Sequence, residues 1–585
     1  MADSGKKEKK KLGGMKTMPF ILSNEVCDRF ATAGFNANMV NYLRNELHVP
    51  LLQATNTLNN FAGTASLTPI VGALIADSFA GRFWTIAVGA TLYQLGMLGV
   101  TISAILPSLR PPPCSPDFPS TCQEAAPWQQ AIFYLSLMLT AVGSGGTRPC
   151  VVAFGAEQLE ENDKSGRKSG SEESSGKGKP SFFNIYFFCI GLSVMLALTV
   201  VVYVQDNVGW GIGFGIPTVS MFISILVFIF GYPIYIRRKP GGSPMARVAQ
   251  VVAAALRKRK LVVPTDGSVL YQNRELDADI STVGLLAHTK QFKFLDRAAI
   301  VADGDIDESS NRPIPWRLST VHRVEELKSI LGILPIWSAG IFISTATSNN
   351  YTFGLVQAKS MDRQLASGFS IPPASFFIFS SASMLLTLTL YDRVIVPLAR
   401  RLTGNPEGIS QLRRIGMGLA IAVLSNVSAA LIENRRRCAA GHISAFWLVP
   451  QCMVHGVSEG FASVGLMEFL YKQSPESMRS IAAALFWLSI SLGHYGGTFL
   501  VTMVSDLTKR SGEGGWLQDD INEGRLDYYY WLVVGMQVFN LVYFIICAKS
   551  YVFKRLEVEE EGDAKLHLGD EDDHEDHPHV HAAVV

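Results

Sequence analysis

The fold of this chain is decided by Gly72-Ala73-Leu74-Ile75-Ala76-Asp77-Ser78-Phe79-Ala80-Gly81-Arg82, which lies between two charge-free runs at 54–76 and 83–106. Each run is long enough to span a bilayer as a helix. The small residues of the connecting stretch allow a tight turn. Its charges, Asp77 and Arg82, can change partners when the neighbouring helices move. The stretch therefore predicts two membrane helices joined by a short loop that acts as a conformational latch.

The composition of the whole chain also indicates a membrane protein. Of its 585 residues, 48% are hydrophobic and only 17% are charged, whereas soluble proteins carry about 25% charged residues. The formal net charge of +1 gives no reason to expect nucleic acid binding. The Gly-Lys-Ser/Thr pattern of a phosphate-binding loop is not visible, which disfavours an ATP-driven pump. We therefore expect a polytopic membrane protein that is not an enzyme.

Apolar runs recur along the chain in two groups of six. They lie at 30–43, 54–76, 83–106, 128–147, 182–205, 208–236, 329–358, 370–391, 415–432, 443–467, 480–505 and 528–548. This pattern predicts an all-α protein with two six-helix bundles, 18–237 and 329–550, joined by a long cytoplasmic linker at 238–328. Polar tails at 1–17 and 551–585 complete the predicted organisation.

The Lys and Arg residues between the runs predict the orientation of the chain in the membrane. Basic clusters at 164–179, 237–239 and 257–260 all fall on one side if the chain has twelve spans, which places both termini in the cytoplasm. Three consecutive arginines at 435–437 fall on the opposite side. They conflict with the ninth and tenth spans of this assignment.

Charged residues also occur at the head of the first span, which reads Glu25-Val26-Cys27-Asp28-Arg29. Glu25, Asp28 and Arg29 are spaced i, i+3 and i+4 and therefore share one face of a helix. Charges inside a bilayer are costly unless they pair or meet water, so such a cluster is by default a functional-site hypothesis. The alternative is the interfacial end of an amphipathic helix.

Two further charges lie within spans, Arg148 in the fourth and Glu459 in the tenth. Counted with the first span, three acids face two bases, so one carboxyl group has no fixed partner and should accept a proton easily in an apolar cavity. An entering anion would compete with the acids for the arginines, and a proton would offset the charge of that anion. The alternative is that these charges only hold the helices together.

Several motifs resemble those of a known family. The stretch at 72–82 resembles the loop motif of the major facilitator superfamily, and Tyr391-Asp392-Arg393 looks like its degenerate copy in the second half. Longer stretches are similar to the plant nitrate/peptide transporter family, which belongs to the proton-dependent oligopeptide transporters. These stretches are Phe154-Gly155-Ala156-Glu157-Gln158, Tyr203-Val204-Gln205-Asp206-Asn207-Val208-Gly209-Trp210 and Trp316-Arg317-Leu318-Ser319-Thr320-Val321. The stretches at 110–114 and 475–480 look closest to the third subfamily.

The resemblance implies the twelve-helix major facilitator fold and transport driven by a proton gradient, without a cofactor. It identifies Glu25 and Arg29 with the family's ExxER proton-coupling motif, in which Asp28 replaces the second Glu. Arg148 occupies the position where many relatives carry a substrate-facing Lys, and Glu459 matches the family's acidic residue in the tenth span. An arginine at this position stays charged and can bind a carboxylate or nitrate through two hydrogen bonds.

The resemblance also bears on the substrate. Ala33 and Asn36 stand where peptide-carrying relatives have the Tyr and Arg that hold the peptide, and Thr347 stands where the nitrate-transporting relative has a histidine. A small anion could still bind to a polar lining that consists of Arg148, Asn36 and the run Thr345, Thr347, Ser348, Asn349 and Asn350. We expect a proton-coupled symporter of a small anion or acidic plant hormone, with nitrate, nitrite and gibberellin as candidates. Tyr351 and Trp487 could wall a larger apolar acid. A di/tripeptide symporter and a membrane anion sensor that does not transport are the alternatives.

Three further expectations concern modification, metal binding and location. Thr85 matches a position that is phosphorylated in the nitrate-transporting relative; a phosphate there would add about two charges beside the latch and would imply a regulatory kinase, whereas the alternative is an ordinary threonine at the membrane interface. Cys114 and Cys122 can form a disulfide if their loop is extracellular. The acidic, histidine-rich tail is interpreted as solvated, not as a metal site. We expect the plasma membrane, with the plastid envelope or vacuolar membrane as alternatives, and leave open a homodimer.

Overall fold

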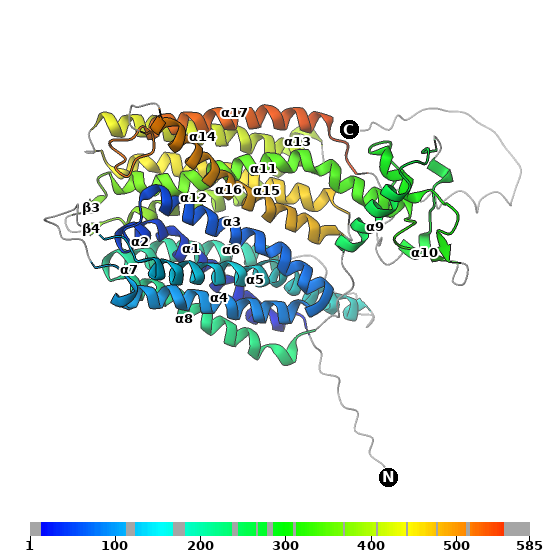
Figure 1. Ribbon diagram of the computed structural model, residues 1–585, viewed down its shortest axis with the longest axis horizontal. Helices are drawn as coiled ribbons and strands as arrows, with labels where there is room; N and C mark the ends of the chain where they lie inside the picture. The colour runs from blue at the N-terminus through cyan, green and yellow to red at the C-terminus, as the bar shows by residue number, and fades with distance from the viewer. Residues whose placement is uncertain are drawn as a thin grey trace, which may run out of the picture.

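The structure of this chain is a computed structural model, drawn as a ribbon in Figure 1. It describes residues 13–112, 123–167, 182–236, 244–264, 267–277, 285–307, 312–366, 369–404, 408–439, 443–475, 478–510 and 515–554. The predicted Cys114–Cys122 disulfide and the histidine-rich tail lie outside the described residues.

The first half of the bundle occupies the lower part of Figure 1 and, after its first span, follows the predicted runs closely. The first span differs from the predicted run at 30–43, because its helix begins at Met18 and breaks at Asn38. The helices of this half are α1 Met18–Ala37 with the short α2 Met39–Asn45, α3 Leu51–Ile75, α4 Arg82–Ile105, α5 Pro127–Arg167, α6 Phe182–Leu196 with α7 Val202–Asn207, and α8 Trp210–Phe230. A π-helical turn at Ala197–Val201 joins α6 to α7.

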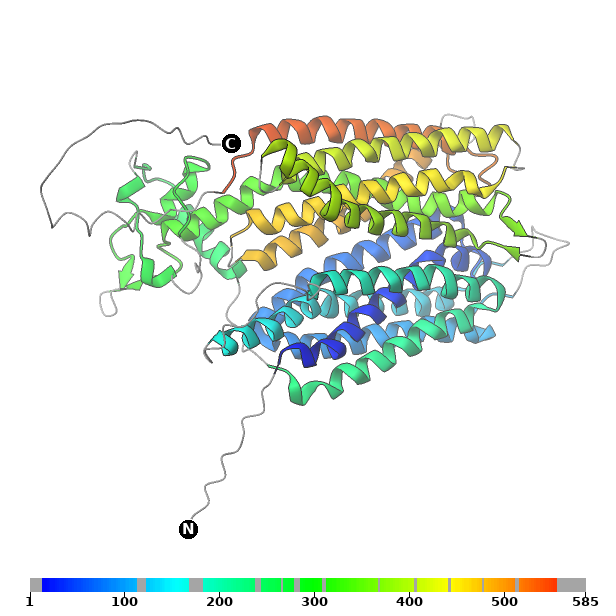
Figure 2. The same cartoon turned by 180° about the vertical axis from the view of Figure 1, so that it is seen from behind.

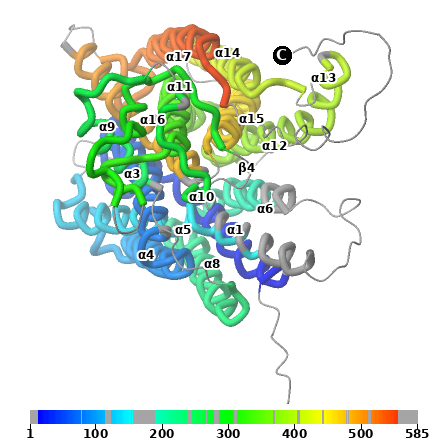
Figure 3. The backbone as a smooth tube through the Cα atoms, turned by 90° about the vertical axis from the view of Figure 1, so that its right-hand side faces the viewer, coloured from blue at the N-terminus to red at the C-terminus, as the bar shows by residue number. Residues whose placement is uncertain are grey.

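The second half repeats this organisation and lies above the first in Figures 1 and 2. Its helices are α11 Val321–Lys359, α12 Ile378–Leu390 with α13 Val396–Thr403, α14 Gln411–Cys438, α15 Leu448–Gln473, α16 Arg479–Arg510 and α17 Leu526–Ser550. The short strands β3 Gln364–Ala366 and β4 Phe369–Ser370 pair antiparallel after α11. Viewed from the linker in Figure 3, the two halves occupy opposite sides of the molecule.

Nine helical segments of the described chain are long and apolar enough to cross a membrane. The helices α1, α5 and α15 pack among these segments and bring the long helices of each half to six. The predicted all-α membrane fold with two six-helix bundles is confirmed.

The linker forms a small folded unit at one end of the bundle, which we call the linker end (Figure 1). It contains α9 Pro244–Arg257, α10 Arg274–Asp277, the 3-10 helix η8 Lys293–Ala299 and the strand pair β1 Ile306–Asp307 with β2 Arg312–Pro313. The opposite end of the bundle is called the loop end below.

Helix α11 begins at Val321, before the predicted start of the seventh span at residue 329. The charges that ended the apolar run in the sequence are buried in the linker. Lys328 is 3% exposed, and its Nζ lies 2.6 Å from Asp296 Oδ1 and 2.7 Å from Glu325 Oε1. Because these charges neutralise one another, the helix extends out of the apolar run without exposing a charged turn.

The arginines at 435–437 lie at the loop end of α14, where the expected orientation disfavours positive charge. Arg436 is fully buried and donates two hydrogen bonds of 2.8 Å to the carboxylate of Glu433, which is also fully buried. Arg437 pairs with Asp527, and Arg435 stacks on the Trp447 ring. The sequence count treated these arginines as free charges, whereas two of them are paired with carboxylates. The ninth and tenth spans therefore stand as α14 and α15.

This buried pair leads to a prediction about stability. Glu433→Gln should lower the free energy of unfolding by about 3–5 kcal/mol, because it leaves the Arg436 guanidinium buried without a counter-charge. Thermal denaturation of the purified protein in detergent measures the loss. Lys472→Gln is the control, since it breaks an exposed pair with Glu468 at 2.8 Å, and such pairs contribute about 0–1 kcal/mol. An equal loss in both variants would contradict the interpretation.

Candidate transport site

The first charged pair of the site lies on α1. Arg29 donates from Nε to Glu25 Oε1 at 2.9 Å, and its Nη2 lies 2.9 Å from the same oxygen. The spacing of four residues places the two side chains one turn apart on the same helix face. Glu25 is 1% exposed, whereas the Arg29 side chain is 24% exposed. Glu25 therefore holds Arg29 firmly in one orientation.

The second pair joins α1 to α5 and is looser. Arg148 Nε lies 3.7 Å from Asp28 Oδ2, and neither oxygen of the buried Asp28 carboxylate accepts a hydrogen bond from a described residue. Arg148 Nη2 instead donates to the Thr32 hydroxyl at 3.1 Å, and this hydroxyl lies 3.0 Å from the Tyr93 hydroxyl. The guanidinium of Arg148 is therefore held at one edge and retains hydrogen-bonding capacity toward an anion.

Glycines bring α5 close to α3 and α4 just before Arg148. A Cβ atom added to Gly145 would collide with the backbone of α3 at Thr68, and one added to Gly146 would collide with the backbone of α4 at Gly89. Helix α5 therefore contacts α3 and α4 backbone to backbone just before Arg148. The sequence Gly143-Ser144-Gly145-Gly146 is the local reason for this close approach.

Trp487 of α16 reaches both arginines from the second half. The centroid of its ring lies 5.8 Å from Arg29 Cζ and 5.9 Å from Arg148 Cζ. A cation over an aromatic ring is attracted by about 0.5–2 kcal/mol, depending on its desolvation. The sequence suggested Trp487 only as one wall of a cavity. Its contact with both guanidinium groups could be found only from the tertiary structure.

The third acid, Glu459, lies in the second half on α15. It forms no hydrogen bond or ion pair with any residue that the structure describes. Tyr351 of α11 interacts electrostatically with Glu459 and packs edge-on against His455, one turn before Glu459, with ring centroids 5.5 Å apart. Of the three acids counted in the sequence, Glu459 is therefore the carboxyl group without a fixed cationic partner.

The predicted polar lining is divided between structural and free side chains. Asn36 lies two turns after Arg29, and its Oδ1 is buried without a hydrogen-bond partner among the described residues. Thr347 is half-buried, and its hydroxyl has no described partner. Its neighbours Thr345 and Ser348 bond to Gly493 O and Asn59 in contacts between helices. Thr345, Ser348 and Asn350 therefore join α11 to other helices. The Thr347 hydroxyl and the buried amide of Asn349 have no hydrogen-bond partner among the described residues.

The predicted latch lies at the linker end of α3 and α4. Asp77 falls in a π-helical turn, Ala76–Ala80, and its side chain is outside what the structure describes. Arg82 is the first residue of α4. Thr85 is 8% exposed and donates its hydroxyl hydrogen to the Gly81 carbonyl at 3.0 Å. A kinase therefore has little access to Thr85 in this conformation, and its phosphorylation stays a prediction.

A cluster of possible metal ligands occurs in the linker. Ligand atoms of His288, Asp296 and Glu325 lie within 4.8 Å of one another. The ammonium group of Lys328 already pairs with both carboxylates at 2.6 and 2.7 Å. The lysine supplies the positive charge that a metal ion would bring, so the cluster is explained as a salt-bridge network.

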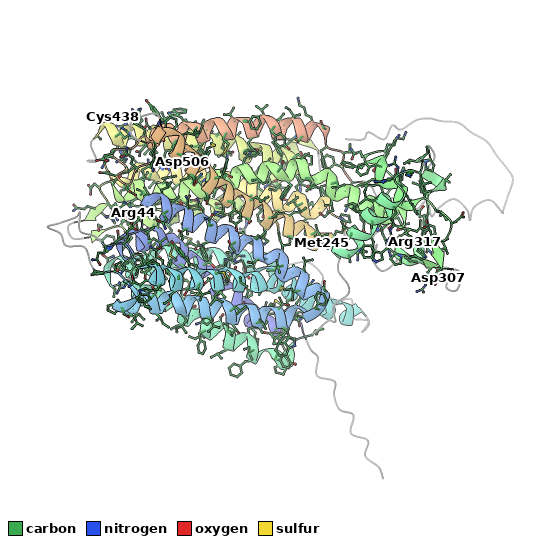
Figure 4. The ribbon with its side chains drawn as sticks, in the orientation of Figure 1. Arg44, Met245, Asp307, Arg317, Cys438 and Asp506 are labelled. Atoms are coloured by element: carbon green, nitrogen blue, oxygen red, sulfur yellow. The ribbon has the colours of Figure 1, made fainter. Side chains whose placement is uncertain are left out.

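Hydrogen bonds between the two halves gather toward the loop end. The backbone N–H of Leu51, at the start of α3, donates to Asp519 Oδ1 at 2.6 Å, and the Thr64 and Tyr495 hydroxyls lie 2.8 Å apart farther along the seam. Others join Asn56 to Thr502, Asn59 to Ser348 and Asn60 to Thr498. Figure 4 shows Arg44, which bonds to the Asp519 carbonyl, at this end.

Two helical bundles that enclose paired charges beside their seam define a polytopic membrane transporter. Residues 83–517 match the sequence pattern described as PTR2, POT family. Protein NRT1/PTR FAMILY 3.1 of Arabidopsis thaliana is 49% identical over 559 residues, which cover 93% of this chain and 92% of that protein. This chain therefore belongs to the POT family, within its plant NRT1/PTR branch, as the motifs predicted. The name of this relative also agrees with the expected third subfamily.

Solved structures support the same fold. A crystal structure described as an auto inhibited POT family peptide transporter matches with a TM-score of 0.68 at 19% identity, covering 92% of this chain and 98% of the other. Another, described as a peptide transporter in complex with sulfate, matches with a TM-score of 0.60 at 16% identity and covers 91% of this chain and 94% of the other.

The position of Trp487 leads to a second prediction. Trp487→Ala should raise KM for an anionic substrate by about 5- to 30-fold, because both guanidinium groups lose the ring that orients them. Trp487→Phe should have a smaller effect, since it keeps a weaker aromatic face. Trp447→Ala is the matched control: it removes a ring that lies 4.2 Å from Arg435 Cζ on another part of the second half. Concentration-dependent uptake at equal surface abundance distinguishes these outcomes.

Proposed function

We propose that this transporter is a proton-coupled symporter of a small anion or an acidic plant hormone, with nitrate, nitrite and gibberellin as the candidates. The observation that carries the proposal is the contrast between the two arginines. Arg29 is fixed by close contacts with Glu25, whereas Arg148 meets Asp28 only at 3.7 Å. An anion that replaces Asp28 at Arg148 therefore breaks no hydrogen bond to that carboxylate and gains a bidentate partner.

The proton has a separate acceptor in this proposal. A carboxyl group buried without a cation accepts a proton more readily than one that is paired. Glu459 is half-buried and has no cationic partner among the described residues. When an anion releases Asp28 from Arg148, Asp28 becomes a second acceptor. Uptake of a proton by either acid offsets the charge of the entering anion and links the two movements.

Alternating access would follow from the seam. The hydrogen bonds that join the halves lie toward the loop end, and an apolar cluster there includes Phe35 and Met39 of the first half with Phe353 and Val501 of the second. This arrangement supports a state that is closed at the loop end and admits substrate from the linker end. Opening of the loop end requires loss of these contacts and formation of others near Asp77 and Arg82.

Both solved structures named above are described as peptide transporters, one of them in complex with sulfate. The di/tripeptide alternative therefore stays open. Ala33 and Asn36 lack the phenol and guanidinium groups that hold the peptide in peptide-carrying relatives. We therefore favour an anion as the substrate. We place the protein in the plasma membrane, with lipid, proton and substrate as its partners.

Uptake measurements test the proposal. Proteoliposomes that contain the purified chain receive nitrate, nitrite, a gibberellin or a dipeptide, with or without an inward proton gradient. The proposal predicts accumulation of an anion above equilibrium only with the gradient. Accumulation of the dipeptide would support the alternative. Binding of an anion without any accumulation would support the anion sensor.

A further inference from the structure

Helix α9 of the linker has apolar residues on two faces. Val251, Ala254 and Ala255 are buried against η8. A second stripe at 245, 249, 252 and 256 repeats at i, i+4, i+7 and i+11 and is exposed. Met245, Val252 and Leu256 in this stripe are 45%, 38% and 65% exposed. The second stripe lies about 120° around the helix from the buried face, since each residue turns the helix by about 100°.

A basic segment follows this stripe directly. Arg257, Arg259 and Lys260 are exposed and form no hydrogen bond or ion pair through their side chains with any residue in the described part of the chain. Lys258 between them is buried and bonds to Asp305 and to the Ile300 carbonyl. Lys258 thus anchors the segment to the linker while its neighbours face outward. Val262, two residues after the last of these cations, is 90% exposed.

The exposed stripe begins next to the bundle. Figure 4 places Met245 at the linker end of the helices, and Asp307 and Arg317 on the far side of the linker. Helix α9 also contacts α11 where that helix leaves the apolar run. The stripe and the basic segment are therefore within reach of the surface of the membrane that the bundle crosses.

We propose that α9 and residues 257–262 dock on an anionic lipid surface at the linker end. An amphipathic helix with basic residues binds such a surface by inserting its exposed apolar stripe into the lipid and by the attraction of its positive charges to the anionic headgroups. Each Lys or Arg near an anionic leaflet favours docking, so the three cations without described partners add to the effect of the apolar stripe. This inference does not depend on the identity of the substrate.

A competing occupant is the acidic segment of this chain at 557–585. It carries eleven Asp and Glu residues between Glu557 and Asp576, so its charge is also complementary to the basic segment. Its apolar residues over the same interval are Val558, Ala564, Leu566 and Leu568, which are not spaced to cover a helical stripe. The continuous apolar stripe therefore favours lipid.

Docking would couple the membrane surface to the start of α11. On α9, Arg247 Nε lies 4.0 Å from Glu326 of α11, and Arg323 of α11 bonds to Asp277 at 3.0 Å. The linker is thus attached to α11 by two ion pairs whose carboxylates are buried. A linker that is held on lipid restrains the first turns of that helix.

Hydrogen–deuterium exchange of the full chain tests the proposal. The protein is placed in nanodiscs of phosphatidylcholine alone or of phosphatidylcholine with phosphatidylserine. Peptides over residues 245–262 should exchange about 10- to 100-fold more slowly with phosphatidylserine, as expected for docking worth about 1.4–3 kcal/mol. Peptides of α14 should be unaffected.

Three variants make the outcome specific. Arg257→Gln/Arg259→Gln/Lys260→Gln should abolish the difference between the lipids, whereas Lys290→Gln/Lys293→Gln/Arg312→Gln, which removes three exposed cations elsewhere in the linker, should retain it. Equal exchange of wild type in both lipids would overturn the proposal. Protection in both lipids that disappears when residues 557–585 are deleted would also overturn it and would identify the acidic segment as the occupant.

Discussion

Arg148→Ala is expected to abolish uptake of anionic substrates, whether the substrate is nitrate or a gibberellin. The guanidinium of Arg148 is almost buried, and only Thr32 and the distant Asp28 carboxylate contact it through polar atoms in the described structure. Removing one partner of a buried charge pair costs about 2–5 kcal/mol, which corresponds to about 30- to 4,000-fold weaker binding. Initial uptake rates at equal surface abundance measure the loss.

Companion variants separate substrate binding from folding. Arg148→Lys should retain part of the uptake, because the charge survives while the bidentate fork does not. Arg148→Ala/Asp28→Asn removes both charges of the pair, so it should restore folding if Arg148→Ala folds poorly, but it should still take up no anion. Arg435→Ala, which removes an exposed arginine stacked on Trp447, should leave uptake normal. Undiminished uptake by Arg148→Ala would assign this arginine to helix packing.

Glu25→Gln is expected to remove uptake driven by the proton gradient while the protein remains folded. Glu25 is the carboxylate that fixes Arg29, and a neutral amide in its place removes the negative charge of this pair. Accumulation should fall at least about tenfold, the loss expected when a charged hydrogen bond worth about 1.5–3 kcal/mol is removed. Uptake with and without an imposed pH gradient measures this effect.

Glu459→Gln separates the role of Glu459 as a proton acceptor from the role of Glu25, which fixes Arg29. Because Glu459 has no described ion-pair partner, its amide leaves no orphaned charge. The variant should exchange internal for external anion at a normal rate but should lose accumulation driven by the gradient. Glu468 lies on α15 like Glu459, but it is paired with Arg414 of α14. Uptake by Glu468→Gln should therefore still depend on the gradient. Full gradient-driven accumulation by Glu25→Gln or Glu459→Gln would show that the corresponding acid is not required for coupling.

The sequence predicted the fold because membrane helices are encoded locally. A span must satisfy its backbone hydrogen bonds within itself and must be apolar over a length set by the bilayer. The runs from 54–76 to 528–548 therefore identified helices without knowledge of their neighbours, and the stretch at 72–82 together with other family motifs identified their common architecture. The prediction was weakest at 435–437, because the carboxylates of Glu433 and Asp527 neutralise two of the three arginines and the count of charges did not include these pairs.

The sequence by itself also supplied the five ionisable residues of the candidate site, because charges inside apolar runs are conspicuous and costly. It determined that three acids accompany two bases. Which acid has no cation was decided only by the tertiary structure, since that property depends on distances between α1, α5 and α15. The contact of Trp487 with Arg29 and Arg148 also joins residues that are hundreds of positions apart. Such contacts depend on how the two halves pack, which the apolar pattern of one helix does not specify.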